Sequence, residues 1–82
     1  MKTDLFNSAI SQRTKIRFLY NLESVIIEPY YLSISSGGNK VIYGRVNNTN
    51  EIRMFEYGKI FNIKVLNNKK FSPIIPILPI YN

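Results

Sequence analysis

The sequence contains no cysteine, no histidine and no tryptophan among its 82 residues. Without cysteine, the chain has neither a disulfide framework nor a thiolate metal site. Without histidine, it lacks the commonest metal ligand and the side chain that most often acts as a general base near neutral pH. From these absences we expect a protein that is not an enzyme and that holds no metal or other cofactor.

Long hydrophobic runs are missing as well. The most apolar stretch, residues 74–81, is interrupted by Pro76 and Pro79, and no run approaches the roughly 18 apolar residues of a membrane span. The first eight residues are too polar for the apolar region of a signal peptide. We therefore expect a cytoplasmic protein without a membrane partner. A chain shorter than the common domain size of about 100–150 residues predicts one small domain.

The residues that are present favour a folded, basic domain. Hydrophobic residues make up 45% of the chain, which has five Phe, six Tyr and a net charge of +6. This apolar content is sufficient for a core, so the chain is not a disordered basic tail.

The spacing of apolar residues changes once along the chain. Residues 3–13 predict a helix, because Phe6 and Ile10 share one helical face while Asp4 and Arg13 suit its two ends. After that the period becomes two, which is typical of strands. The predicted strands fall between residues 14 and 66, at 15–20, 25–35, 40–46, 51–57 and 59–66.

Five short strands separated by polar turns predict a small antiparallel barrel or sandwich. A barrel capped by the helix is favoured, because a small sheet that does not close leaves two unpaired edges. Pro29 cannot donate a ladder hydrogen bond, so a bend, bulge or edge position is expected near Glu28 and Pro29. Gly37 and Gly38 read as a hairpin turn.

Residues 71–82 differ from the rest of the chain and are expected to form an extended arm beyond a domain of residues 1–70. Pro73, Pro76 and Pro79 recur every three residues, which is the period of a polyproline II helix. Such an arm could be a partner-binding peptide or could pack on its own domain or on a second subunit. The packed arm is favoured, because residues 74–81 carry six large apolar side chains and the segment has no charge.

Catalytic motifs are not recognisable. No serine has a histidine to activate it, and the glycine pair is not followed by a phosphate-binding helix. Glu28 and Glu56 are the carboxylates least explained by turns or a helix start. For them we favour structural pairing with Arg17, Arg53 or Lys59 over acid–base catalysis.

Basic and aromatic residues alternate along the predicted strands. This arrangement suits single-stranded nucleic acid, whose phosphates pair with cations and whose bases stack on rings. It equally suits a sheet whose cations keep its edges soluble and whose rings fill the core. The residues concerned are Lys15, Arg17, Tyr20, Tyr30, Tyr31, Lys40, Tyr43, Arg45, Arg53, Phe55, Tyr57, Lys59 and Lys64.

The order of residues 5–66 resembles the WYL domain of bacterial transcription regulators and phage-defence proteins. The matching features are a helix with Ala9-Ile10 and Arg13, the strand 15–20 ending in Tyr, Glu28-Pro29-Tyr30-Tyr31-Leu32, a Gly turn, Tyr43-Gly44, Arg53-Met54-Phe55 and Lys59-Ile60. The resemblance implies a five-stranded SH3-like or Sm-like barrel. It also implies a ligand sensor whose basic surface binds nucleic acid, single-stranded DNA or a related nucleotide, often in a dimer.

The chain departs from the family pattern in three places. The Trp-Tyr-Leu tripeptide that names the family falls near residues 40–42, where none of the three residues is retained. Glu56 stands where the family usually has an Arg, and Lys59 replaces a second Arg. Glu reverses the charge expected to meet an anion, and Lys lacks the two-pronged geometry of Arg. The eleven residues of the predicted helix are too few for a helix-turn-helix reader.

Together these observations predict a non-enzymatic, WYL-like module that binds single-stranded nucleic acid or a nucleotide-like anion in bacterial regulation or phage defence. The alternative is a protein-interaction or oligomerisation module that uses the barrel edge and the Pro-rich arm. A homo-oligomer or a larger regulatory protein is the expected partner. The expected ligand-binding residues are Lys40, Tyr43, Arg45, Arg53 and Lys59.

Overall fold

The computed structural model describes residues 2–73, which form one helix, five strands and a short 3-10 helix. In chain order these are α1 (Lys2–Gln12), β1 (Thr14–Tyr20), β2 (Glu23–Ile34), β3 (Lys40–Val46), β4 (Ile52–Glu56), η1 (Tyr57–Lys59) and β5 (Ile60–Lys70). The predicted helix and five strands are therefore confirmed. Most of the arm predicted for residues 71–82 lies outside the described residues.

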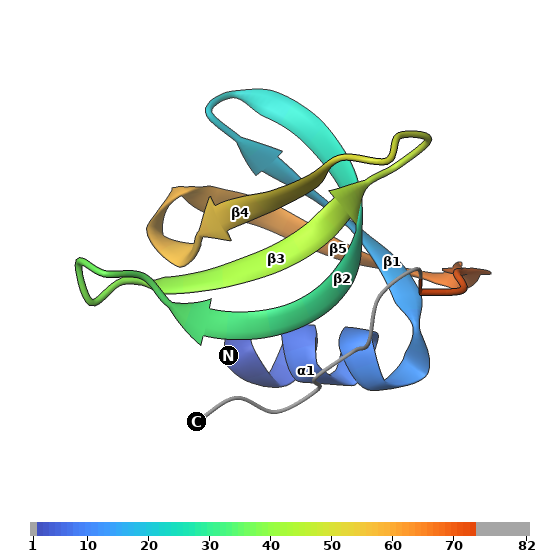
Figure 1. Ribbon diagram of the computed structural model, residues 1–82. Helices are drawn as coiled ribbons and strands as arrows, with labels where there is room; N and C mark the ends of the chain where they lie inside the picture. The colour runs from blue at the N-terminus through green and yellow to red at the C-terminus, as the bar shows by residue number, and fades with distance from the viewer. Residues whose placement is uncertain (1, 74–82) are drawn as a thin grey trace.

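The five strands form one antiparallel sheet in the order β4-β3-β2-β1-β5. The sheet is strongly curled, with α1 lying across one end of it (Figure 1). Within residues 2–73, β4 and β5 are the two edges and do not pair with each other, so a closed barrel is not confirmed. Side chains bridge from β1 to β4 instead: the Tyr20 hydroxyl accepts a hydrogen bond from the Glu56 amide at 3.1 Å.

The helix buries one face, as its apolar spacing predicts. Phe6, Ala9 and Ile10 are buried, and Asp4 lies in the first turn, where its charge suits the helix dipole. Arg13 was expected in the last turn but lies just beyond the helix. Its φ of 54° is in the left-handed region, and its amide donates to the Ile10 carbonyl at 3.1 Å, which ends the helix before β1.

The bulge expected near Pro29 is confirmed in β2. Pro29 lies opposite Gly44 and Tyr31 lies opposite Tyr43, which leaves Tyr30 as the extra residue. Gly44 fits here because it has no side chain. A Cβ at this position would lie 2.7 Å from both the Glu28 carbonyl oxygen and the Ile27 Cδ1.

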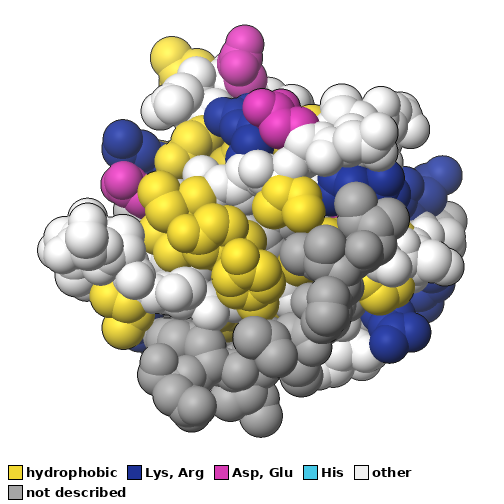
Figure 2. Space-filling model, viewed as in Figure 1, with side chains coloured by type: hydrophobic (Ala, Val, Ile, Leu, Met, Phe, Trp, Pro, Cys, Tyr) yellow, Lys and Arg dark blue, Asp and Glu magenta, His cyan; other side chains and the backbone are white. Residues whose placement is uncertain are grey.

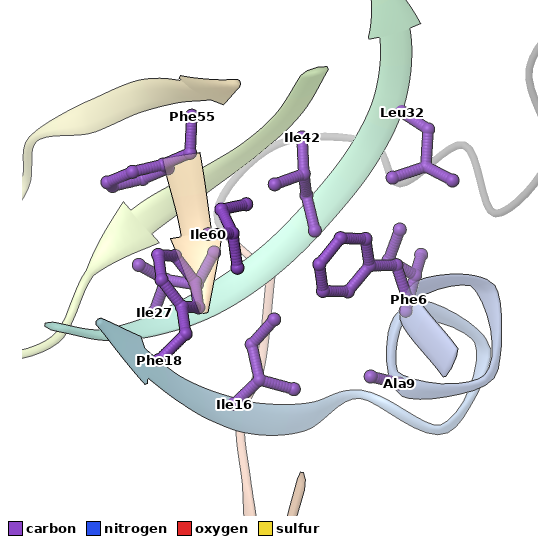
Figure 3. Close-up of a cluster of buried hydrophobic side chains, with 10 residues drawn as sticks. Phe6, Ala9, Ile16, Phe18, Ile27, Leu32, Ile42, Phe55 and Ile60 are labelled. Carbon is purple, nitrogen blue, oxygen red and sulfur yellow. The ribbon is translucent and has the colours of Figure 1, made fainter. Parts of the chain in front are cut away.

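The core draws on the helix and on every strand, as Figure 3 shows. Its aromatic part lies beneath β1 and β4, where the Phe18 and Tyr20 rings each meet the Phe55 ring edge-on, at centroid distances of 5.2 and 5.0 Å. The cluster consists of Phe6, Ala9, Ile10, Ile16, Phe18, Ile27, Leu32, Ile42, Phe55 and Ile60.

The last strand extends further than the sequence indicated, to Lys70 rather than to residue 66. Its end is held because Lys70 pairs with Thr14 and the Phe71 amide donates to the Arg13 carbonyl at 3.0 Å. The Phe71 ring then lies 5.8 Å from that of the buried Tyr30. Within residues 2–73 as a whole, no helix is long and apolar enough to cross a membrane.

Candidate functional site

The outer face of the sheet, which points away from the core, carries a charged cluster across β1, β2 and β3. Glu28 is only 3% exposed, and its carboxylate accepts two hydrogen bonds from Arg45, one from Nε and one from a terminal nitrogen, both at 2.8 Å. The Lys15 ammonium lies 4.0 Å from the same carboxylate and donates to Asn47 at 2.7 Å. The cluster exists because Arg45 lies directly opposite Glu28 in the β2–β3 ladder.

The hydrogen bonds to Glu28 raise the pKa of Arg45, an effect that the Glu28 charge reinforces and that burial opposes. The third guanidinium nitrogen donates to the Thr49 carbonyl at 3.2 Å. All three guanidinium nitrogens of Arg45 therefore donate hydrogen bonds to groups of the protein itself. The sequence predicts that Glu28 pairs with Arg17, Arg53 or Lys59, whereas in the structure it pairs with Arg45 and Lys15.

An aromatic pair lies beside this cluster on the outer face. Tyr31 and Tyr43 are opposite each other and stack at a centroid distance of 4.7 Å, with 19° between the ring planes. The Tyr43 hydroxyl reaches the Met54 sulfur at 3.5 Å. Figure 2 shows hydrophobic side chains gathered over β3 and β4 on this side of the molecule, with Lys and Arg side chains around the patch.

Two further predicted residues, Lys40 and Arg53, belong to the opposite, core-side face. Arg53 lies opposite Gly44 at the rim of the core, and its guanidinium carbon is 5.0 Å from the centroid of the Phe55 ring. Both Arg53 and Lys40 are exposed, and neither makes an ion pair with another residue of the described chain. Lys40 begins β3 opposite Ile34, two positions before the buried Ile42.

Lys59, the fifth predicted residue, lies in η1 between β4 and β5. Its ammonium is 3.9 Å from the Glu56 carboxylate, and both side chains are partly exposed. The pairing expected for Glu56 is thus present in a weak surface form. Glu56 and Lys59, the two residues that depart from the WYL pattern after Phe55, therefore lie next to each other.

The five predicted residues are therefore not gathered into one pocket. Tyr43 and Arg45 share the outer face, Lys40 and Arg53 share the core-side face, and Lys59 lies in the connection after β4. The outer face also contains Tyr31 and Lys15, which the sequence indicated only as members of the basic and aromatic pattern. No group of three or more acidic side chains that could hold a metal ion occurs in residues 2–73.

A separate hollow of about 300 Å³ lies at the β1–β2 turn, beside η1 and the start of β5. It is mainly apolar, and Lys59 supplies its one charged side chain among the described residues. None of its apolar residues was singled out by the sequence. The lining residues are Leu19, Asn21, Leu22, Gly58, Lys59 and Phe61.

Comparison with known proteins gives one structural likeness. No protein-family model matches the chain, and no curated protein matches its sequence. The fold is similar to part of proteasome accessory factor B/C (PafBC) of Arthrobacter aurescens, with a TM-score of 0.75 and 25% identity over 85% of this chain. The match covers 12% of the PafBC chain, so this chain corresponds to about an eighth of that protein. The likeness is consistent with the WYL-like fold that the sequence resemblance implies.

Proposed function

We propose that this chain is a non-enzymatic, WYL-like sensing module that binds single-stranded nucleic acid or a nucleotide-like anion in the bacterial cytoplasm. The observation that carries the proposal is the likeness to PafBC, which spans 85% of this chain. A role in bacterial regulation or phage defence is part of the same proposal, and it is supported by the resemblance of residues 5–66 to WYL domains. Fold likeness does not name a ligand, so the ligand class is inferred from the surface.

We also propose that the curled sheet is an SH3-like or Sm-like barrel. In support, η1 joins the two edge strands β4 and β5 within three residues. The Tyr20 side chain spans the open side by accepting a hydrogen bond from Glu56 and contacting Phe55.

Arg53 is the proposed main contact for the anion. Its guanidinium is exposed, lies over the Phe55 ring and makes no ion pair within residues 2–73. A planar guanidinium with free donors binds a phosphate through two parallel hydrogen bonds. Lys40, at the start of β3, and Lys59, in η1, add positive charge beyond the Glu56 end of β4, and Lys59 gives up only an exposed pair with Glu56.

Tyr43 and Arg45 have a different part in this proposal, because they lie on the outer face. Tyr43 supplies an aromatic surface beside the Lys15–Glu28–Arg45 cluster, where a base could stack. Arg45 holds Tyr43's strand against β2 through its bonds to Glu28 and leaves direct phosphate contact to other cations.

Fluorescence anisotropy with a labelled oligothymidine tests the proposal. We expect binding at low salt that weakens as salt rises, because phosphate contacts release counterions. Arg53→Glu should weaken binding about tenfold or more, whereas Lys69→Glu, an equal charge change at the end of β5, should have a smaller effect. No binding at low salt to the oligonucleotide or to a labelled nucleotide would contradict the proposed ligand class.

The alternative proposal, an interaction or oligomerisation module, is favoured by the two sheet edges. Within the described residues β4 and β5 each have one side without a neighbouring strand, and such edges can pair with another chain. Light scattering should then show a defined oligomer that dissociates when the Pro-rich residues after Ser72 are removed. A monomer at all concentrations would exclude this alternative.

A further inference from the structure

The turn between β1 and β2 holds a leucine in a strained conformation. Tyr20 and Glu23 are directly opposite, so Asn21 and Leu22 form a two-residue hairpin loop with φ values of 51° and 67°. Such a loop needs left-handed conformations at both positions, and glycine is the usual second residue. Leu22 takes that position at a steric cost. Its side chain is 96% exposed, so packing within the described chain does not compensate for the strain.

The strained leucine borders the apolar hollow. Phe61, which is 61% exposed, lies opposite Leu19 on the neighbouring strand and forms part of the same lining. A register shift in β5 places Phe61 there, and Asn62 has a left-handed φ of 54° at this point. Gly58 has open space where a Cβ would lie. Two large exposed apolar side chains thus flank a hollow of about 300 Å³, the lower end of the range for ligand pockets.

Cations surround the hollow. Lys59 lines it, and the Lys2 ammonium lies 6.0 Å from the centroid of the Phe61 ring. Arg17 and Lys64 are opposite each other two positions before Leu19 along β1, and both are exposed. Two carboxylates lie near these four cations: Glu56, which pairs with Lys59, and the exposed Glu23, which directly follows Leu22. The rim therefore has a net positive charge, while the floor is apolar.

The apolar lining and the cationic rim together indicate which kind of molecule fits the hollow. A second copy that presented the same face would bring the two cationic rims together, which is repulsive. A nucleic-acid base stacks on an open ring face, whereas this lining is largely aliphatic, with Leu19 and Leu22 beside Phe61. A large apolar side chain fits the floor, and carboxylates next to it complement the rim.

We propose that this hollow, formed around Leu22 and Phe61, docks an acidic peptide segment of a partner protein that inserts one large apolar side chain. Leu22 and Phe61 are the apolar anchors, and Lys59 with Lys2 faces the flanking carboxylates. The site is independent of the proposed anion contact at Arg53. Only Lys59 is common to both, so the test relies on the apolar anchors.

Selection of random peptides displayed on phage, with the full chain as bait, tests the proposal. We expect the enriched peptides to carry Leu, Phe, Ile or Trp flanked by Asp and Glu. Synthetic copies should bind Leu22→Asp and Phe61→Ala about tenfold or more weakly than the unmodified chain. Ile34→Asp is the matched control, because Ile34 is also an exposed apolar residue but lies at the other end of β2.

Leu22→Gly separates binding from folding. Glycine relieves the left-handed strain, so the variant should unfold at a higher temperature than the unmodified chain while binding the selected peptides about tenfold more weakly. A purely structural role of Leu22 predicts no loss of binding.

Three results would overturn the proposal. The first is a selection that yields no peptide of this composition. The second is peptide binding that Leu22→Gly and Phe61→Ala leave unchanged. The third is a loss of oligothymidine binding in these two variants with no effect on peptides, which would assign the hollow to nucleic acid. Loss of oligothymidine binding in Arg53→Glu alone concerns the anion contact and leaves the peptide site intact.

Discussion

Arg45 and Glu28 lie directly opposite each other on β3 and β2 and form a two-pronged ion pair, with both nitrogen–oxygen distances at 2.8 Å. The carboxylate is buried, whereas the Arg45 side chain is 21% exposed. The two partners therefore differ in what their removal leaves behind. An arginine without its partner can still reach water, but a buried carboxylate without its partner cannot.

Arg45→Met should therefore destabilise the fold more than Glu28→Gln. Among the described residues, methionine leaves the buried carboxylate with only Lys15, at 4.0 Å, as a counter-charge. Glutamine is neutral and can still accept a hydrogen bond, so we expect Glu28→Gln to cost about 1–3 kcal/mol. Urea denaturation followed by circular dichroism measures both. Equal losses in the two variants would show that burial of Glu28 does not determine the cost.

Gly44→Ala should lower the free energy of unfolding by about 1–3 kcal/mol, because the new methyl group would overpack the contact with β2. The Glu28 carbonyl oxygen, which it would meet at 2.7 Å, belongs to the backbone and cannot turn away. Gly58→Ala is the control, since open space surrounds that position. We expect Gly58→Ala to be neutral or stabilising by up to about 1 kcal/mol. The prediction fails if thermal denaturation ranks the two variants the other way round.

The fold was largely predictable because its strands follow local rules. The period-two pattern marked every strand, and Pro29 marked the bulge, since proline cannot donate to the ladder. The end of β5 was missed because Asn67 to Lys70 carry no apolar alternation. Lys70 pairs with Thr14, a long-range contact that the sequence of this segment does not indicate.

The candidate site was less predictable, because a cation's partner depends on strand register. Arg45 resembled a free ligand-binding residue in the sequence, yet the β2–β3 register places it against Glu28. Arg53, two positions before Phe55 on β4, faces the other side of the sheet from Arg45. The hollow was missed for a related reason. It is formed by a turn, η1 and β5, and the β1–β5 register, which places Phe61 opposite Leu19, brings Phe61 to the turn that holds Leu22.

Tyr20→Phe tests whether one hydroxyl group bridges β1 and β4. The Tyr20 hydroxyl accepts from the Glu56 amide at 3.1 Å, so its removal should cost about 0.5–1.5 kcal/mol and increase hydrogen exchange at that amide. Tyr43→Phe is a matched control, because within residues 2–73 that hydroxyl has only an exposed contact with the Met54 sulfur. We expect the control to change stability by less than about 0.5 kcal/mol. Unchanged exchange at Glu56 in Tyr20→Phe would show that the bridge does not hold β4.

The salt dependence of oligothymidine binding distinguishes the charge of Arg53 from its shape. Arg53→Ala should reduce the slope of log affinity against log salt by about one, because one phosphate contact is lost. Arg53→Lys should keep the slope while weakening binding at every salt concentration. In the unmodified chain, the guanidinium carbon of Arg53 lies 5.0 Å from the centroid of the Phe55 ring. Lysine preserves the charge but loses the paired donors and this flat contact over the ring.

Lys69→Ala removes one exposed charge at the end of β5 and provides the reference for a change in net charge alone. If Arg53→Ala and Lys69→Ala change the slope equally, Arg53 contributes only to the overall field of the protein. If Arg53→Lys binds as tightly as the unmodified chain, the two-pronged contact with phosphate is absent. A smaller slope for Arg53→Ala together with weaker binding for Arg53→Lys identifies Arg53 as a direct phosphate contact, because a diffuse field responds to charge and not to the shape of the group that carries it.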